Sequence, residues 1–208
     1  TKPEGWDTRL IPTVENPEDA IIYEGHVRDF SARDNSVTEA NRGKYLAFTE
    51  LNSAPMQHLQ TLAQNGLTHF HLLPITDIGT IDEDVSKRVD ISDTLGDLCE
   101  QINDEADACK TQDKNSTIID LMGGYLPGSD DAQALANAMR SLDSFNWGYD
   151  PHYFIAPEGS YASSPEGIAR VKETRAMVQS LQSIGLRVVL DVVYNHTTSS
   201  GIWDKSVF

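Results

Sequence analysis

The hydrophobic pattern of the chain alternates between short apolar runs and amphipathic segments. Apolar runs of strand length occur at 20–27 and 66–75, and a third follows Gly185. Segments 54–65 and 164–184 carry apolar residues at helical spacing, which predicts helices. An order of strand, helix, strand, helix and strand predicts a parallel sheet of the α/β class.

Local signals mark where the two helices begin and end. Ser53 is expected to cap the first helix, and Gly66 to end it. Pro165 is expected at the first helical position of the second, which Gly185 ends. The buried stripe predicted for this second helix has five members: Ile168, Val171, Val178, Leu181 and Ile184.

The segment 76–163 interrupts this pattern after the second strand. It is acidic and has turn signals at Gly123-Gly124 and Pro127-Gly128, with a short helix predicted near 131–141. Loops of this length in compact domains are either functional or disordered, and the aromatic content of this one favours a function. Functional loops of parallel α/β folds leave from the carboxyl ends of strands, as this one does.

The net charge of the chain limits the kinds of partner that it can bind. The chain has 16 basic and 32 acidic residues and a formal net charge of −16. A surface of this charge repels phosphate backbones and anionic lipid, so neither nucleic acid nor a membrane is expected as a partner. No apolar run approaches the roughly 18 residues of a membrane span, so no transmembrane segment is predicted. A neutral ligand such as a sugar is compatible with the charge, although a solvated surface is its simplest explanation.

Cys99 and Cys109 are the two cysteines of the chain. They can form a disulfide, which would favour an exported protein, or remain two free thiols. His69 and His71 lie two residues apart in a predicted strand, so they share one face and could bind a metal. Packing of both histidines within the fold is the simpler interpretation.

The third strand leads into a polar cluster. Asp191 follows the apolar run Val188–Leu190, and Tyr194, Asn195 and His196 come next. The carboxyl ends of parallel strands are where α/β folds bind ligands and perform chemistry. The cluster is therefore the first candidate for a functional site.

Several motifs resemble one enzyme family. DVVYNH at 191–196 resembles the first signature region of the α-amylase clan of glycoside hydrolases. FNWGYDP at 145–151 and YFIAPEGSYAS at 153–163 resemble the pullulanases, which are α-1,6 debranching enzymes of that clan. IIYEGHVRDFSA at 21–32 and THFHLLPITD at 68–77 are similar to their first two barrel strands.

The resemblance implies a fold and its divisions. It implies the first three βα units of a (β/α)₈ TIM barrel, with a long insertion after strand 2. Residues 1–19 would be a linker or lead-in, and 20–208 the N-terminal portion of the catalytic barrel, with 76–163 as a long βα loop. The acidic insertion with two cysteines is similar to the secreted Gram-negative enzymes, which implies a secreted or cell-surface protein.

The resemblance also implies roles for three residues. Tyr149 would stack on the sugar at the cleavage point, and His196 would hydrogen-bond to the same sugar. Asp191 would orient an arginine from a later strand. Aromatic rings cover the apolar faces of sugars well, which agrees with the role of Tyr149.

Three further residues are secondary candidates. Trp147 is a candidate for substrate binding, although loop packing is the simpler interpretation for Trp147 and Phe145. Asp150 would hold the loop that carries Tyr149. Asn195 would support its own loop, and its equivalent in related amylases can ligate calcium. Calcium is therefore a possible ion, with the acidic cluster 82–84 as another source of oxygen ligands, and no organic cofactor is expected.

The expected reaction is hydrolysis of α-1,6-glucosidic linkages in pullulan, branched starch or glycogen dextrins, with retention of configuration. Retention needs two carboxylates about 5–5.5 Å apart. In this clan they come from later strands, so both are expected beyond Phe208. The 208 residues alone are therefore expected to be inactive and to require the rest of the catalytic domain.

Two alternatives remain at this point. One is an inactive α-glucan-binding module on a barrel scaffold. The other is a different hydrolase of the clan, of the isoamylase or neopullulanase type.

Overall fold

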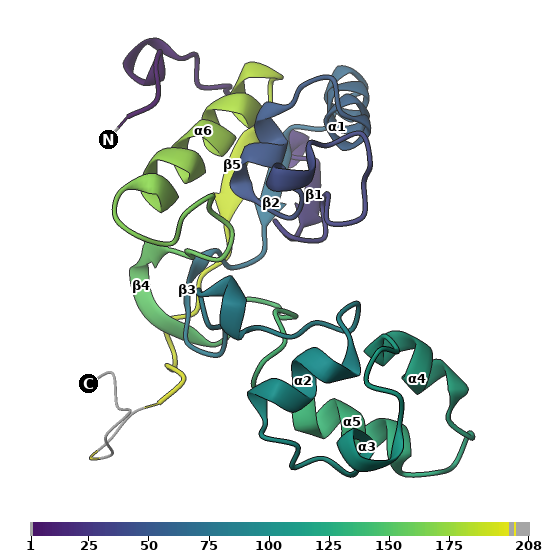
Figure 1. The fold of residues 1–208 in the computed structure, drawn as a ribbon. Coiled ribbons are helices and arrows are strands. Elements are labelled where there is room, and N and C mark those ends of the chain that lie inside the picture. The colour runs from purple at the N-terminus through teal and green to yellow at the C-terminus, as the bar shows by residue number, and fades with distance from the viewer. Residues whose placement is uncertain (1, 200–201, 203–208) are drawn as a thin grey trace. The chain divides into compact units, whose positions relative to one another are not determined.

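The structure is a computed structural model that describes residues 2–199 and 202. It has two compact units (Figure 1). The first, called the sheet unit here, comprises Thr1–Gly79 and Trp147–Phe208. The second, called the helical unit, comprises Thr80–Asn146.

The sheet unit contains a parallel sheet of three short strands. They are β1 (Ile22–Gly25), β2 (His69–Leu72) and β5 (Arg187–Leu190), in the order β1-β2-β5. Helix α1 (Ala54–Gln64) lies between β1 and β2 in the chain, and α6 (Ala169–Ser183) precedes β5. The predicted strand–helix order and the parallel pairing are confirmed.

A second, antiparallel pair of strands was not predicted. It joins β3 (Thr76–Ile78) to β4 (Pro151–Pro157), and its register shifts twice within three residues. The pair brings together the two flanks of the long excursion. The helical unit therefore contains fewer residues than the segment 76–163, because both ends of that segment belong to the sheet unit.

The predicted start of α6 is wrong. The helix begins at Ala169 rather than at Pro165. Gly167 has a left-handed φ of 67°, which interrupts a helical path from Pro165. The side chain of Arg170 also donates to the carbonyl of Pro165 at 2.9 Å, so a side chain takes the place of a helical N–H.

The ends of α1 agree better with the prediction. Ser53 occupies the N-cap position, but its hydroxyl is buried and has no hydrogen-bond partner among the residues that the structure describes. Gly66 follows the helix with a φ of 107°, a conformation that glycine adopts without strain.

The core of the sheet unit gathers large side chains from α1, α6, β2 and the loop between β1 and α1. Its fully buried members include Tyr45, Phe48, Met56, Leu59, Phe70, Leu72, Met177 and Leu181. The stripe predicted for α6 is only partly right, because Leu181 is buried whereas Ile168 is 62% exposed. Glu173 and Met177 are the other buried residues of this helix.

The outer strands of the sheet keep apolar side chains exposed. Ile22 of β1 is 57% exposed and Leu190 of β5 is 47% exposed. Among the described residues, each of these strands pairs only with β2, so each has one unpaired edge. An apolar run such as Val188–Leu190 is typical of a strand covered on both faces, but the described residues leave Val189 36% exposed and Leu190 47% exposed.

The helical unit contains four short helices: α2 (Leu95–Gln101), α3 (Asp107–Thr111), α4 (Ile118–Gly124) and α5 (Asp131–Met139). The predicted helix near 131–141 is therefore confirmed. The buried cluster of this unit consists of Val89, Leu95, Leu98, Cys99, Cys109, Ile118, Leu135 and Met139.

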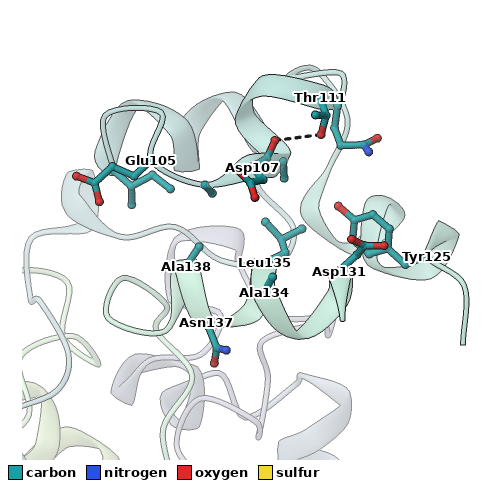
Figure 2. A pocket seen from close by; sticks show the side chains of 13 residues that line it. Glu105, Asp107, Thr111, Tyr125, Asp131, Ala134, Leu135, Asn137 and Ala138 are labelled. Atoms are coloured by element: carbon teal, nitrogen blue, oxygen red, sulfur yellow. Dashed lines mark hydrogen bonds between the residues drawn. The ribbon is translucent and has the colours of Figure 1, made fainter. Parts of the chain in front are cut away.

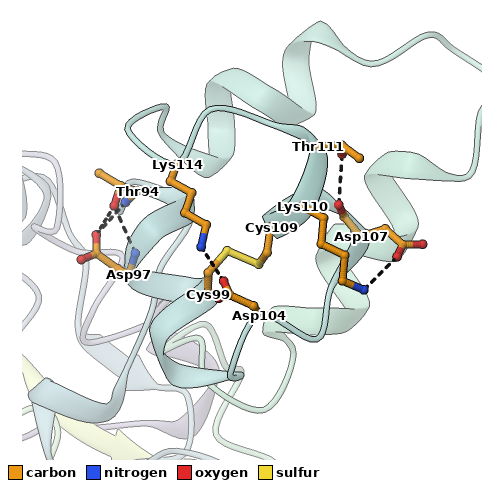
Figure 3. Close-up of a disulfide and its surroundings, with 9 residues drawn as sticks. All are labelled: Thr94, Asp97, Cys99, Asp104, Asp107, Cys109, Lys110, Thr111 and Lys114. Carbon is orange, nitrogen blue, oxygen red and sulfur yellow. Dashed lines mark hydrogen bonds and ion pairs between the residues drawn. A yellow bond between two sulfur atoms is a disulfide. The ribbon is translucent and has the colours of Figure 1, made fainter.

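Cys99 of α2 and Cys109 of α3 form a disulfide, which is one of the two alternatives left open by the sequence (Figure 3). Next to it, Lys114 pairs with Asp104 at 2.5 Å. Thr94 begins α2 with a capping box: its hydroxyl accepts from the N–H of Asp97, and the Asp97 carboxylate accepts from the N–H of Thr94.

The described residues of the predicted lead-in, 2–19, contact the sheet unit. Arg9 donates to Gln182 of α6 at 2.8 Å, and Arg187 donates to the carbonyl of Pro12 at 2.9 Å. The guanidinium of Arg9 also lies 3.7 Å above the ring of Trp6. The predicted boundary at residue 19 stays a prediction, and Thr1 and most of the residues after 199 lie outside the described part.

Candidate functional site

Three of the residues singled out in the sequence meet at the carboxyl end of β5. The hydroxyl of Tyr149 donates to Asp191 Oδ2 at 2.6 Å, although the two residues are 42 positions apart. Nε2 of His196 lies 2.8 Å from the carbonyl oxygen of Tyr149, which can only accept a hydrogen bond. Tyr149, Asp191 and His196 therefore form one connected cluster, called the tyrosine cluster here.

The backbone places Tyr149 through its neighbour Gly148. Gly148 has a φ of 82°, and a Cβ atom there would lie 2.3 Å from the carbonyl oxygen of Pro74. Only glycine permits this approach without displacement of the loop. On the other side of Tyr149, the carbonyl of Asp150 accepts from the N–H of Gly79 at 2.9 Å. The loop is thus held against the end of β2 and the start of the excursion.

Asp191 is placed by the sheet. Its backbone N–H donates to the carbonyl of Leu72 at 2.9 Å, which continues the pairing of β2 and β5 by one residue. The Asp191 carboxylate therefore stands at the carboxyl end of the sheet, as the sequence predicted.

The electrostatics of the cluster keep the phenol of Tyr149 protonated. The hydrogen bond to Asp191, together with desolvation and the negative charges of Asp191 and Glu24, raises the pKa of Tyr149 to about 12. The neutral phenol is therefore a hydrogen-bond donor at all ordinary pH values. Because Nε2 of His196 donates to a carbonyl, its Nδ1 is the acceptor in the neutral ring.

The arrangement can bind and orient a polyhydroxylated ligand. Tyr149 is 40% exposed, so part of its ring surface is open to a ligand. Aromatic faces with a few placed polar groups suit the apolar and polar sides of a sugar ring. Retaining glycoside hydrolysis requires two carboxylates about 5–5.5 Å apart. The tyrosine cluster contains a single carboxylate, that of Asp191, which is already bound to the Tyr149 hydroxyl, so the cluster by itself supplies no such pair.

The other predicted residues lie beside the cluster in the sequence but not within it. Trp147 is 59% exposed, and both its loop packing and its part in substrate binding stay predictions. Asp150 holds the loop through its backbone carbonyl, whereas its side chain makes no hydrogen bond with a described residue. The exposed side chain of Asn195 likewise has no hydrogen-bond partner in the described part of the chain.

Two glutamates near the cluster were not found from the sequence. Glu24 of β1 contributes to the raised pKa of Tyr149. Glu158 is fully buried and accepts hydrogen bonds from the N–H groups of Ile78 and Ser160. An acidic residue in a polar, turn-rich segment gives no hydrophobic signal of burial, so the pattern could not reveal Glu158.

The histidine pair is not supported as a metal site. His69 contacts Thr68, and His71 lies 3.8 Å from Glu24. Burial, with the charge of Arg187, lowers the pKa of His69. Within the described residues, neither histidine belongs to a group of three side chains that could ligate one ion. In the acidic segment 82–84, Asp84 binds Ser86, and calcium stays a prediction.

Each unit has a groove of its own. In the sheet unit, a groove of about 400 Å³ lies between β1 and α1 and is lined by residues such as Tyr23, His58 and Phe70. In the helical unit, a groove of about 580 Å³ lies between α3 and α5 (Figure 2). Tyr125, Asp131 and Asn137 line it together with the small side chains Ala134 and Ala138.

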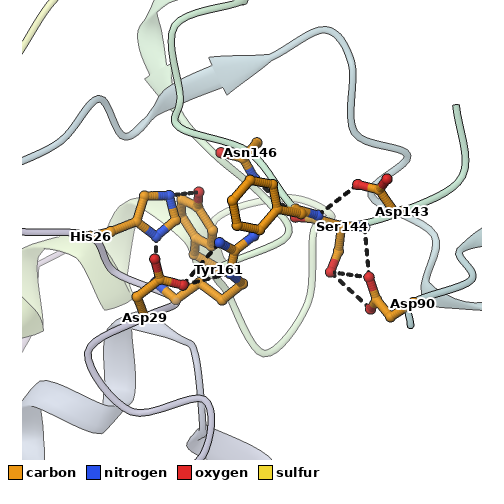
Figure 4. A network of polar contacts seen from close by, with 9 residues as sticks. His26, Asp29, Asp90, Asp143, Ser144, Asn146 and Tyr161 are labelled. Atoms are coloured by element: carbon orange, nitrogen blue, oxygen red, sulfur yellow. Dashed lines mark hydrogen bonds and ion pairs between the residues drawn. The ribbon is translucent and has the colours of Figure 1, made fainter. Parts of the chain in front are cut away.

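Figure 4 shows polar contacts of both units. In the sheet unit, the hydroxyl of Tyr161 lies 3.2 Å from Nε2 of the buried His26. In the helical unit, Asp90 accepts from the hydroxyl and the N–H of Ser144, which ties the two ends of that unit together.

Comparison with known proteins gives one consistent result. No protein-family model matches the chain. The chain is 40% identical over 220 residues to the pullulanase of Klebsiella pneumoniae, covering 99% of this chain and 20% of that protein. It is 44% identical over 206 residues to pullulanase 1, chloroplastic, of Arabidopsis thaliana, covering 98% of this chain and 19% of that protein.

A solved structure agrees with the sequences. The ligand-free crystal structure of PulA from Klebsiella pneumoniae matches with a TM-score of 0.88 at 40% identity, covering 99% of this chain and 21% of that one. The homologues of this chain are therefore glycoside hydrolases. Over nearly its whole length the chain is homologous to one part of the larger pullulanase enzyme, and it spans about one fifth of the length of the curated relatives it matches.

Proposed function

We propose that the protein containing this chain hydrolyses α-1,6-glucosidic linkages in pullulan, branched starch or glycogen dextrins, with retention of configuration. The observation that carries the proposal is the tyrosine cluster at the carboxyl end of β5, in a chain homologous to pullulanases. In this proposal the chain supplies the side of the site on which the sugar stacks, and the carboxylate pair comes from residues after Phe208.

The roles within the cluster follow from its contacts. Tyr149 offers its ring to the sugar at the cleavage point, while its hydroxyl is occupied by Asp191. His196 is held by the carbonyl of Tyr149 and is exposed, so its remaining ring nitrogen is the hydrogen-bonding group that it offers to the sugar. Asp191 keeps a second carboxylate oxygen with which to orient a basic side chain.

The proposed architecture is the beginning of a closed (β/α)₈ barrel. Two features support it: the three parallel strands run in sequence order, and the outer edges of β1 and β5 are unpaired in the described chain. Exposed strand edges with apolar side chains such as Ile22 and Leu190 are normally covered. Further strands of the same protein would cover them and complete the sheet.

The direct test is incubation of the full-length protein with pullulan, with the released oligosaccharides identified by chromatography. Maltotriose as the main product is expected. Panose or isopanose would contradict α-1,6 cleavage and indicate a neopullulanase type, whereas activity on glycogen but not on pullulan would indicate an isoamylase type. Absence of all products would favour the inactive glucan-binding module. The chain 1–208 alone is expected to release nothing, because it lacks the carboxylate pair.

Location and calcium are secondary proposals. The disulfide between Cys99 and Cys109 supports a secreted or cell-surface protein, since such bonds persist in oxidising compartments. Fractionation of the source cells tests the location. A chelator that lowers the melting temperature of the full-length protein, with recovery on added calcium, would support a bound ion, and an unchanged melting temperature would contradict it.

A further inference from the structure

The pairing of β3 with β4 contains prolines, which limit the backbone hydrogen bonds it can form. Two of its three register pairs, Thr76 with Pro157 and Ile78 with Pro151, include a proline, which has no N–H to donate. The register also shifts between successive pairs. A strand pair of this kind needs another source of hydrogen bonds to hold its geometry.

Glu158, directly after β4, supplies them. One carboxylate oxygen accepts from the N–H of Ile78 in β3 at 2.7 Å, and the other accepts from the N–H of Ser160 at 2.8 Å. The backbone of Glu158 is fixed as well: its N–H donates to the carbonyl of Ile75, and its carbonyl accepts from the hydroxyl of the buried Tyr45. The side chain is fully buried, so solvent does not compete for these bonds.

A short series of backbone contacts connects Glu158 to Tyr149. Ile78, which Glu158 holds, is followed by Gly79, whose N–H donates to the carbonyl of Asp150 at 2.9 Å. Asp150 is the residue after Tyr149, and Gly148 before it is packed against Pro74. A shift of β3 relative to β4 therefore moves the loop that presents the ring of Tyr149.

We propose that Glu158 is a positioning residue for the tyrosine cluster: its carboxylate takes the place of the missing strand hydrogen bonds between β3 and β4, and so fixes where Tyr149 meets its ligand. The proposal rests on the proposed function in that the ligand is the sugar at the cleavage point. Glu158 itself contacts neither Asp191 nor His196 by a hydrogen bond in the described structure, and it acts through the backbone.

The chain offers a matched control in Glu173. This glutamate of α6 is also buried, and its carboxylate also accepts from a backbone N–H, that of Ser163 at 2.8 Å. It also accepts from the hydroxyl of Ser163, but it has no hydrogen bond to β3 or to the loop of Tyr149. A purely structural role of buried glutamates would give Glu158→Gln and Glu173→Gln the same consequences.

The experiment measures pullulan hydrolysis by the full-length protein with each substitution. Gln keeps one acceptor oxygen but places an NH₂ group against the second N–H, so Glu158→Gln is expected to lower kcat/KM by about 10- to 100-fold, the scale of a misplaced binding group. Glu173→Gln is expected to lower the melting temperature with kcat/KM within about twofold. Equal losses of kcat/KM in the two variants would overturn the proposal.

A double-mutant cycle separates positioning from general damage. In a Tyr149→Ala background, Glu158→Gln is expected to cost less than about twofold further, because its effect passes through Tyr149. Full additivity would overturn the proposal. If Glu158→Gln does not fold, Glu158→Asp, which keeps the charge but draws the carboxylate back by one methylene, is measured in the same way.

Hydrogen exchange gives a readout that does not depend on activity. Faster exchange of backbone amides at 147–150 in Glu158→Gln, but not in Glu173→Gln, is expected. If the wild-type protein hydrolyses no α-glucan, the proposed function fails, and the exchange experiment still decides whether Glu158 positions the loop. Unchanged exchange in Glu158→Gln would refute that role.

Discussion

The two units of the molecule are stabilised in different ways. The sheet unit has a core of large aromatic and aliphatic side chains, yet within the described residues its sheet has two unpaired edges, and a buried glutamate bonds to β3 beside the β3–β4 pair. The helical unit has a small buried cluster, a disulfide that links α2 to α3, and side-chain caps at the starts of α2 and α4. The candidate site therefore lies in the unit with the large core, whereas the helical unit has a buried cluster and a covalent cross-link of its own.

A tyrosine from each unit gives the sharpest test of this division. Tyr149→Ala removes the ring and the hydrogen bond to Asp191, and is expected to lower kcat/KM on pullulan by about 100-fold in the full-length protein. Tyr125→Ala, in the groove of the helical unit, is expected to change it by less than about twofold. Steady-state kinetics measure both, and a larger loss from Tyr125→Ala would break the comparison.

Two glycines with positive φ test how tightly each unit holds its loops. Gly148→Ala is expected to destabilise by about 3 kcal/mol, because it adds backbone strain to a clash with Pro74. Gly128→Ala in the helical unit also has a positive φ of 96°, but its Cβ would meet nothing within 4 Å. It is expected to cost about 1 kcal/mol from backbone strain alone. Denaturant unfolding measures both, and equal costs would refute the close packing of the Gly148 loop.

Removal of the disulfide tests whether the helical unit is stabilised separately from the sheet unit. The bond closes a loop with a sequence separation of 10. Replacement of Cys99 and Cys109 by Ala is expected to cost that unit about 2–3 kcal/mol, since the cross-link limits the unfolded chain. Hydrogen exchange is expected to rise in α2 and α3 while the amides of β2 stay protected. A comparable rise in β2 would contradict separate stabilisation of the two units.

A pH titration gives the smallest effect. The hydrogen bond to Asp191 raises the pKa of Tyr149 from 10.0 to about 12, so the folded state binds the proton more tightly than the unfolded state. The resulting stabilisation is complete below pH 10 and is lost as pH rises towards 12. Tyr149→Phe is therefore expected to reduce the loss of stability across this window. The ultraviolet signal of phenolate, compared between wild type and Tyr149→Phe, locates the midpoint, and a midpoint near 10 would contradict the contact.

The sequence predicted those elements whose signals are local. The parallel strands and α1 follow from apolar periodicity, and the polar end of β5 follows from the residues directly after its apolar run. The start of α6 was missed because Pro165 is a sound helix-start signal, which Gly167 and Arg170 override through contacts made only in the folded chain.

The β3–β4 pair and the role of Glu158 depend on contacts that the pattern does not encode. Prolines at both ends of β4 argue against a strand, and β3 has three residues. The hydrogen bond between Tyr149 and Asp191 could be expected only from the family resemblance. The helical unit, Thr80–Asn146, separates Tyr149 from the second strand in the sequence, so no local pattern relates Tyr149 to the sheet. The polar end of the sheet can therefore be predicted from the sequence, whereas the hydrogen bonds that join Tyr149 to Asp191 and His196 are seen only in the structure.

The central claim is that Tyr149, Asp191 and His196 together bind the sugar at the cleavage point of a debranching enzyme. A crystal structure of the full-length protein with bound maltotriose tests it most directly. We expect a glucose ring stacked on Tyr149 and hydrogen-bonded to His196, with Asp191 still accepting from the Tyr149 hydroxyl. Maltotriose bound at the catalytic carboxylates with no contact to Tyr149 or His196 would contradict the claim.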